Sequence, residues 1–308
     1  MDQRYLPLKG KRAMSIKILL ACVAAVSFSA TATAAPDWPK VDAAMGRTGV
    51  DQPGGVHRYA FPRADLTVAL DGVVIKPALA LGSWTAFQTM GDQVAVMGDL
   101  VLTQEEVTPV MRSLLASGFT ITALHNHLLR SVPATMYMHV GATGDPVKLA
   151  HALHDALALS HTPLAPPLAQ PTTAQPALAL DTAALDGLMG AKGKISGGVY
   201  QFSFPRSEAL TAGGMPAPAS MGTATAINFQ PTGSGSAAIT GDFVLTAAEV
   251  DPVMRALVSG GIEITALHNH MLADQPRLFF MHFWANQDAK QLARGLRSAL
   301  NRMSLQKP

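Results

Sequence analysis

Two nearly identical nine-residue segments place histidines where they could bind a metal ion. ITALHNHLL at 121–129 and ITALHNHML at 264–272 each contain a His-Asn-His triplet. The residues before the first triplet are typical of a β-strand, in which side chains two positions apart share a face. We therefore expect His125 and His127 on one face of a strand, with Asn126 on the other.

A third histidine follows each triplet at the same distance along the chain. A hairpin centred on Pro133 would place His127 opposite His139, because both lie six residues from the proline. Side chains opposite each other in a sheet have Cβ atoms ~5 Å apart, so the three rings could meet at one point. The same pattern is predicted in the second segment for His268, Asn269, His270, Pro276 and His282.

Three neutral imidazoles leave a fourth coordination position open, as in catalytic zinc sites. Such an ion could activate water or polarise a carbonyl group, which would suit a metal-dependent hydrolase. Imidazole also suits copper and nickel. We expect His268, His270 and His282 to bind a metal ion or a small polar ligand, with His125, His127 and His139 as a second or vestigial site. The alternative is a non-catalytic binding or interaction module whose histidines form structural hydrogen bonds.

Several polar residues are candidate supporting groups of such a site, namely Asn126, Asn269 and Arg277 together with two glutamates and two further arginines. Glu106 and Glu249 could act as a general base or a fourth ligand, although each also fits a capping box at a helix start. Arg63 and Arg206 each follow a Phe-Pro pair, at 61–62 and 204–205, and could hold an anionic group. For these arginines we favour surface ion pairs with Asp65 and Glu208.

The two segments belong to a larger repeat. Residues 98–127 and 241–270 align without a gap and share 20 of 30 residues at an offset of 143. A period this long indicates a duplicated domain. We expect a signal peptide at 1–34, a first repeat at 35–159, a linker rich in proline and alanine at 160–184 and a second repeat at 185–308.

Each repeat is predicted to have an α+β fold. Short runs typical of strands come first, and a helix follows them. A capping box at Thr103 competes with Pro109, which would interrupt a helix begun there, so we expect the helix to start at Thr108. Leucines at i, i+4 spacing predict a final helix in each repeat. Because both repeats bring the same apolar faces, we expect them to pack with approximate two-fold symmetry.

The first residues resemble a secretory signal. Five basic residues precede an apolar run at 18–28 and the small residues SATATAA. The run is too short for a stable membrane span, which needs ~20 residues. The protein is thus expected to be periplasmic or secreted, with Met1 or Met14 as its start. The only cysteine, Cys22, lies in the segment expected to be removed, which excludes disulfides and thiolate ligands afterwards.

Charge gives no support for a nucleic-acid partner. The chain has 23 basic and 21 acidic residues, and removal of residues 1–34 leaves 18 basic and 20 acidic ones without a basic run. No order of residues typical of a serine hydrolase, phosphate loop or nucleotide site is present. The oligomeric state is not indicated.

The segments TALHNHML, PRLFFMHFWA at 276–285 and VYQFSFPR at 199–206 resemble the LppY/LpqO family of exported bacterial proteins. The resemblance covers nearly the whole chain after the signal. It implies an exported protein, in some members lipid-anchored, with two copies of a domain and no characterised function. The first repeat lacks an equivalent of Arg277 and has Gly141 where the second has Trp284, so only the second repeat would act if those residues contact substrate.

Overall fold

The computed structural model describes residues 36–91, 93–165 and 178–307, and these described residues belong to one compact unit. The expected signal peptide, with Met14 and Cys22, lies outside the described residues, as does the middle of the expected linker. No helix in the described part of the chain has the length and apolar character to cross a membrane.

The first repeat begins with a helix and then forms a sheet, with one long helix between two of its strands and another after the last strand. Its elements are α1 Trp38–Met45, β1 Val50–Gln52, β2 Val56–Pro62, β3 Val68–Leu70, β4 Val73–Ile75, α2 Pro77–Ala80, β5 Gly82–Met90, β6 Gln93–Thr103, α3 Gln104–Ala116, β7 Thr120–His125, β8 Thr135–Gly144 and α4 Pro146–Leu157.

The second repeat follows the same course. Its elements are α5 Thr182–Met189, β9 Lys194–Ser196, β10 Val199–Phe204, β11 Thr211–Ala212, β12 Met215–Pro216, the short 3-10 helix η1 Ala219–Met221, β13 Thr225–Gly233, β14 Ser236–Thr246, α6 Ala247–Ser259, β15 Glu263–His268, β16 Asp274–Gln275, β17 Leu278–Asp288 and α7 Ala289–Leu300. Helix α5 starts inside the segment expected to be linker.

The main sheets of the two repeats have the same strand order. The first sheet runs β1-β2-β5-β6-β8-β7 and the second runs β9-β10-β13-β14-β17-β15, with antiparallel pairing throughout. Each strand thus has its counterpart at the same position. The predicted α+β fold in two copies is confirmed.

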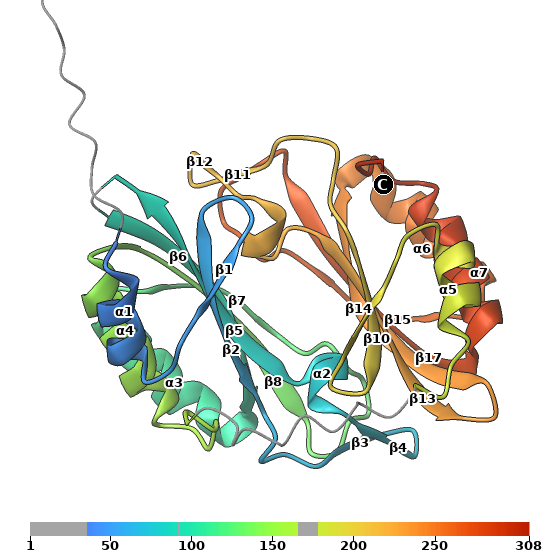
Figure 1. Cartoon of the computed structure of the whole chain (residues 1–308), viewed down its shortest axis with the longest axis horizontal. Coiled ribbons are helices and arrows are strands. Elements are labelled where there is room, and N and C mark those ends of the chain that lie inside the picture. Colours follow the sequence, from blue (N-terminus) through green and yellow to red (C-terminus); the bar gives the residue numbers. More distant parts are fainter. Residues whose placement is uncertain (1–35, 92, 166–177, 308) are drawn as a thin grey trace, which may run out of the picture. The chain divides into compact units, whose positions relative to one another are not determined.

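Helices cover one face of each sheet (Figure 1). Helices α1, α3 and α4 lie over the first sheet, and α5, α6 and α7 lie over the second. Each helix layer and its sheet enclose a separate apolar core. The predicted leucines of the final helices, such as Leu153 in α4 and Leu296 in α7, are fully buried in these cores.

The other faces of the two sheets meet each other. Val101 and Tyr137 of the first repeat share one apolar cluster with Ala238 and Trp284 of the second. Trp284 also donates from its indole nitrogen to Asp71 across the repeats, at 3.1 Å. The interface between the repeats is therefore a third apolar core, and a polar group buried in it without a hydrogen-bond partner costs free energy.

The helix α3 starts five residues earlier than we expected, because its N-cap is Thr103 rather than Thr108. It begins at Gln104, directly after Thr103, and both hydrogen bonds of the capping box are present. Pro109 lies inside the helix, where its ring prevents one backbone hydrogen bond. The buried Glu106 explains the difference, because the carboxylate that closes the capping box is also held by Arg63. Helix α6 repeats this arrangement from Ala247, with Pro252 inside it.

Candidate metal centre

The strands that carry the first histidines end earlier than predicted. β7 ends at His125 and β15 ends at His268, so His127 and His270 belong to the loops that follow. The register also differs from the hairpin prediction, since His139 lies opposite Ala123 rather than His127. The loop is centred near Ser131, two residues before Pro133, which accounts for the shift, and a bulge between Ile121 and Ala123 lies farther along the strand. The second repeat has the same register, with Ala266 opposite His282.

The neighbouring strands place a carboxylate beside the third histidine of each repeat. Asp99 of β6 lies directly opposite His139 of β8, and Asp242 of β14 lies opposite His282 of β17. Our sequence reasoning missed both aspartates. A signal for them existed, because Gly-Asp at 98–99 and 241–242 begins the block that is nearly identical in the two repeats.

Six histidine rings meet in the interface between the repeats. His125, His127 and His139 form a first imidazole layer, and His268, His270 and His282 form a second layer that stacks on it. Across the layers, ring centroids are 3.5 Å apart for His125 and His268, 3.6 Å for His127 and His282, and 3.7 Å for His139 and His270. His127 corresponds to His270 and His139 to His282, so the last two pairs are the same contact seen from either repeat. The layers therefore have the expected two-fold symmetry.

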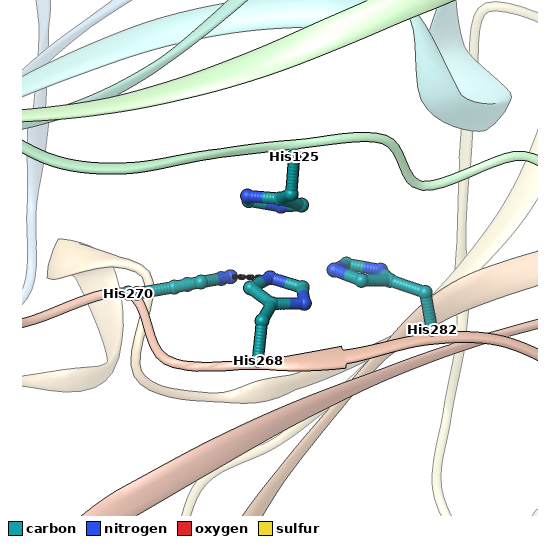
Figure 2. Close-up of side chains that lie close together, drawn as sticks. All are labelled: His125, His268, His270 and His282. Atoms are coloured by element: carbon teal, nitrogen blue, oxygen red, sulfur yellow. Dashed lines mark hydrogen bonds between the residues drawn. The ribbon is translucent and has the colours of Figure 1, made fainter.

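Rings of the same layer lie side by side. In the second layer, the centroid of His268 is 4.9 Å from those of His270 and His282, and the latter two are 6.2 Å apart. Figure 2 shows His270 and His282 pointing toward His268 from its two sides, while His125 reaches over His268 from the other repeat. In the first layer, His125 is 4.9 Å from His127 and 5.1 Å from His139.

Hydrogen bonds orient several of these rings. The Nδ1 atom of His282 lies 2.8 Å from the carbonyl oxygen of Gly241, which can only accept, so Nδ1 carries the proton. The Nε2 atom of His282 consequently has a free lone pair directed into the cluster. Nε2 atoms of His125 and His127 are 2.9 Å apart, and those of His268 and His270 are 3.0 Å apart.

Many polar atoms of this cluster have no hydrogen-bond partner. Among the described residues, ten buried side-chain nitrogen or oxygen atoms lack one, and six of them lie here. They are Asp99 Oδ1, His125 Nδ1, His139 Nε2, Asp242 Oδ1, His268 Nδ1 and His282 Nε2. Each unpartnered buried polar atom normally costs about 1–3 kcal/mol. A cation bound among several of these atoms would satisfy them together.

The separations between these polar atoms fit a cation. Asp242 Oδ1 is 3.8 Å from His282 Nε2, and Asp242 Oδ2 is 3.8 Å from His270 Nε2. Asp99 Oδ1 is likewise 3.8 Å from His139 Nε2. These distances are too long for hydrogen bonds. They suit two ligand atoms on one ion, since each metal bond is about 2.0–2.2 Å long.

Burial keeps the histidines neutral. It lowers the pKa of His125 to about 3, with a smaller contribution from His268, and it lowers that of His268 to about 4. Burial and the neighbouring rings hold the pKa values of the other four well below the usual range. Neutral imidazole is the form that binds metal. Burial also raises the pKa of Asp99 to about 8.

Two overlapping groups of four histidines meet the spacing of a metal site. One contains His125 with the second layer, and the other contains His268 with the first layer. Within each group the ligand atoms all lie within 4.8 Å of one another. Each group therefore combines the three histidines predicted for one repeat with one histidine of the other.

The candidate supporting residues lie elsewhere. Arg63 is buried rather than at the surface, and it pairs with Asp65 at 2.7 Å and with Glu106 at 2.8 Å. Arg206 forms the same pairs with Glu208 and Glu249. Because both glutamates are occupied in these ion pairs, neither is placed to act as a base or metal ligand for the imidazole layers.

The remaining candidates also have other contacts. Asn126 is exposed, and Asn269 donates from its amide to the carbonyl oxygen of Leu278. Arg277 pairs with Asp274 at 2.9 Å and donates to the carbonyl oxygens of the loop that carries His270. It is therefore a loop-stabilising residue of the second repeat.

Comparison with known families agrees with the repeat. A family described as a Domain of Unknown Function (DUF1259) matches residues 39–159 and again 183–302. The chain belongs to the DUF1259 family. It contains two copies of the domain, and the imidazole layers lie between them. No curated protein matches the chain.

Two solved structures of bacterial microcompartment shell proteins are distantly similar. The trimeric shell protein PduB is 11% identical over 83% of this chain and 90% of its own, with a TM-score of 0.22. EtuB from Clostridium kluyveri is 8% identical over 82% of this chain and 89% of its own, with a TM-score of 0.20. Likeness at this level carries no argument about function.

Proposed function

We propose that this DUF1259 protein is an exported metal-binding protein whose six histidines hold a first-row transition metal between its two domains. The unpartnered polar atoms of the imidazole layers carry the proposal, because atoms such as His282 Nε2 and Asp242 Oδ1 face each other at 3.8 Å, which is too far for a hydrogen bond. Zinc is the metal we expect, and imidazole ligands also suit copper and nickel. Export follows from the signal-like first residues and from the resemblance to LppY/LpqO proteins.

The hydrogen bond from His282 Nδ1 to the carbonyl oxygen of Gly241 supports the same conclusion. Metal-binding histidines usually donate their other ring N–H to a carbonyl or carboxylate, which fixes the tautomer. His282 makes this contact with Gly241. An imidazole held in this way presents its lone pair without rotating, so little entropy is lost when an ion binds.

A purely structural role is the second candidate. The rings of the two repeats stack on each other, and the pairs His125–His127 and His268–His270 have hydrogen-bond separations. Such contacts would hold the domains together without any ion. They leave six buried polar atoms of the histidines and aspartates without a hydrogen-bond partner, however, which is why we favour a bound metal.

Metal content separates the two roles. The mature chain, purified without a histidine tag and dialysed against zinc and then against buffer, should retain zinc, and the retained zinc should fall sharply in His282→Gln. Asn126→Gln is the matched control, since that side chain is exposed on the same segment as the histidines. Retention below about 0.2 ion per chain in the unmodified protein would leave the structural role as the explanation.

Hydrolysis is a further reaction that this centre could support. An ion held by three imidazoles keeps a position for water, whose pKa it lowers to about 7. Cleavage of an activated ester that stops on chelation and returns with zinc would support a hydrolase. Zinc retention without such cleavage would support a binding protein.

A further inference from the structure

We infer that the centre holds two metal ions, one in each imidazole layer, rather than a single ion shared by both. This inference rests on the proposed metal binding and adds the number and arrangement of the ions. It assigns the first ion to His125, His127 and His139, and the second to His268, His270 and His282.

The distances between rings assign each ion to one layer. Two imidazoles that bind one zinc ion have ring centroids roughly 5–5.5 Å apart, because each zinc–nitrogen bond is ~2.0–2.1 Å long. Within a layer, the separations between centroids are 4.9–6.2 Å. The centroids of His125 and His268, which face each other across the layers, are only 3.5 Å apart, so these two rings are too close to bind the same ion.

The spacing within a layer also suits an ion. With a zinc–nitrogen bond of ~2.0–2.1 Å, three coordinating imidazoles have ring centroids roughly 5–5.5 Å apart. The second layer has centroid separations of 4.9, 4.9 and 6.2 Å, and the first layer has 4.9 and 5.1 Å around His125. Small rotations of the rings would bring each set onto its ion.

The stacking distance sets the separation of the ions. The three stacked pairs are 3.5, 3.6 and 3.7 Å apart, so ions at corresponding points of the layers would be separated by a similar distance. Two-metal sites in enzymes have ions about 3.5–4 Å apart. The layers therefore have the spacing of a dinuclear centre.

Two cations so close together need negative charge nearby. Asp99 is buried and Asp242 is half-buried, and each has a buried carboxylate oxygen without a hydrogen-bond partner. Asp99 adjoins His139 of the first layer, while Asp242 adjoins His270 and His282 of the second. Each ion thus has one carboxylate beside its own histidines, which reduces the repulsion between the ions.

Zinc stoichiometry tests the arrangement. Chelator-treated mature chain should take up about two zinc ions, as measured by elemental analysis after dialysis. His127→Gln and His270→Gln should each retain about one ion, because each removes a ligand from a single layer, and the double variant should retain none. Asn126→Gln and Asn269→Gln are matched controls and should behave like the unmodified chain.

A single shared ion gives a different pattern. The unmodified chain would then take up about one ion, His270→Gln would keep it in the other group of four, and His268→Gln would lose it because His268 belongs to both groups. That pattern would overturn the two-ion arrangement while leaving metal binding intact. No zinc in the unmodified chain would overturn metal binding itself.

Copper provides a spectroscopic test of the same arrangement. Two copper(II) ions at this separation couple magnetically, so the resonance signal should account for much less than the bound copper. His127→Gln should restore a signal equal to its remaining copper. A full, uncoupled signal from the unmodified chain loaded with two copper ions would contradict adjacent sites.

Discussion

Arg63 donates from its two terminal nitrogens to both oxygens of Glu106, at 2.8 and 3.1 Å, in a fully buried pair that is repeated by Arg206 and Glu249. This pair joins the end of β2 to the first turn of α3. It also places the glutamate that caps the helix. The pair thus stabilises the fold of each domain and lies away from the imidazole layers.

Removing the Glu106 charge should strongly destabilise the protein. Glu106→Gln leaves the buried guanidinium of Arg63 with only Asp65 as a charged partner, and breaking a buried pair typically costs about 3–5 kcal/mol. Urea denaturation followed by circular dichroism would measure the loss. Glu105→Gln, on the exposed side of the same turn, should change stability by less than about 0.5 kcal/mol. Equal effects of the two changes would argue against the assigned role.

Metal-free protein should lose stability as the pH falls below about 6.5. Burial lowers the pKa of His125 to about 3 and that of His268 to about 4, so the folded state binds fewer protons than the unfolded state between these values and 6.5. The stabilisation is complete above the unfolded pKa and disappears as the pH falls through this window. Asp99 opposes the trend, because burial raises its pKa to about 8, but six histidines outnumber two aspartates.

Chemical denaturation at several pH values would measure this effect. The slope of stability against pH between about 4 and 6.5 should decrease in His125→Gln. A variant of the exposed Asn126 should keep the original slope. An unchanged slope in His125→Gln would show that this histidine titrates normally in the folded protein.

Bound metal should stabilise the folded chain across the interface between the domains. Ligand at a hundredfold excess over its dissociation constant adds about 2.7 kcal/mol per site. Zinc should therefore raise the midpoint of thermal unfolding, and a chelator should reverse the rise. In a chain with both His127→Gln and His270→Gln, zinc should leave the midpoint unchanged, whereas a similar rise there would place the effect at another site.

Gly241→Ala should disturb both the sheet and the centre. A Cβ atom at this position would clash with the backbone carbonyl of Ala226 on β13, and the Gly241 carbonyl also orients His282. Forcing extra volume into a packed site typically costs about 1–3 kcal/mol. Gly187→Ala is the control, because an added Cβ in α5 meets nothing within 4 Å and improves helix propensity. Both changes can be compared by thermal unfolding and by zinc retention.

The repeat and the α+β fold could be predicted from the sequence, and so could the histidines to consider. The local backbone geometry around those histidines could not. Strand alternation predicted that His125 and His127 share a face, but β7 ends at His125, and a loop brings His127 to the layer instead. A bulge of one residue cannot be read from apolar alternation. The contribution of both repeats to one centre was also not predictable, because it depends on how two sheets face each other rather than on spacing along the chain.

Asp99 illustrates what pattern reasoning overlooked. An aspartate within a buried strand of apolar residues costs free energy unless it has a partner. Its presence in both repeats, as Asp99 and Asp242, was a sign that such a partner exists. Cross-strand pairing with His139 became visible only once the register of β6 and β8 was known.

The stacking of His125 on its own equivalent, His268, has a consequence for how such a centre can be assembled. A contact between equivalent residues is isologous, so two separate chains with one domain each could form the same interface as a homodimer. Joining the domains in one polypeptide removes the dependence of that interface on protein concentration. It also lets the two halves differ, as they do where Tyr137 stacks on His127 and Phe280 stacks on His270.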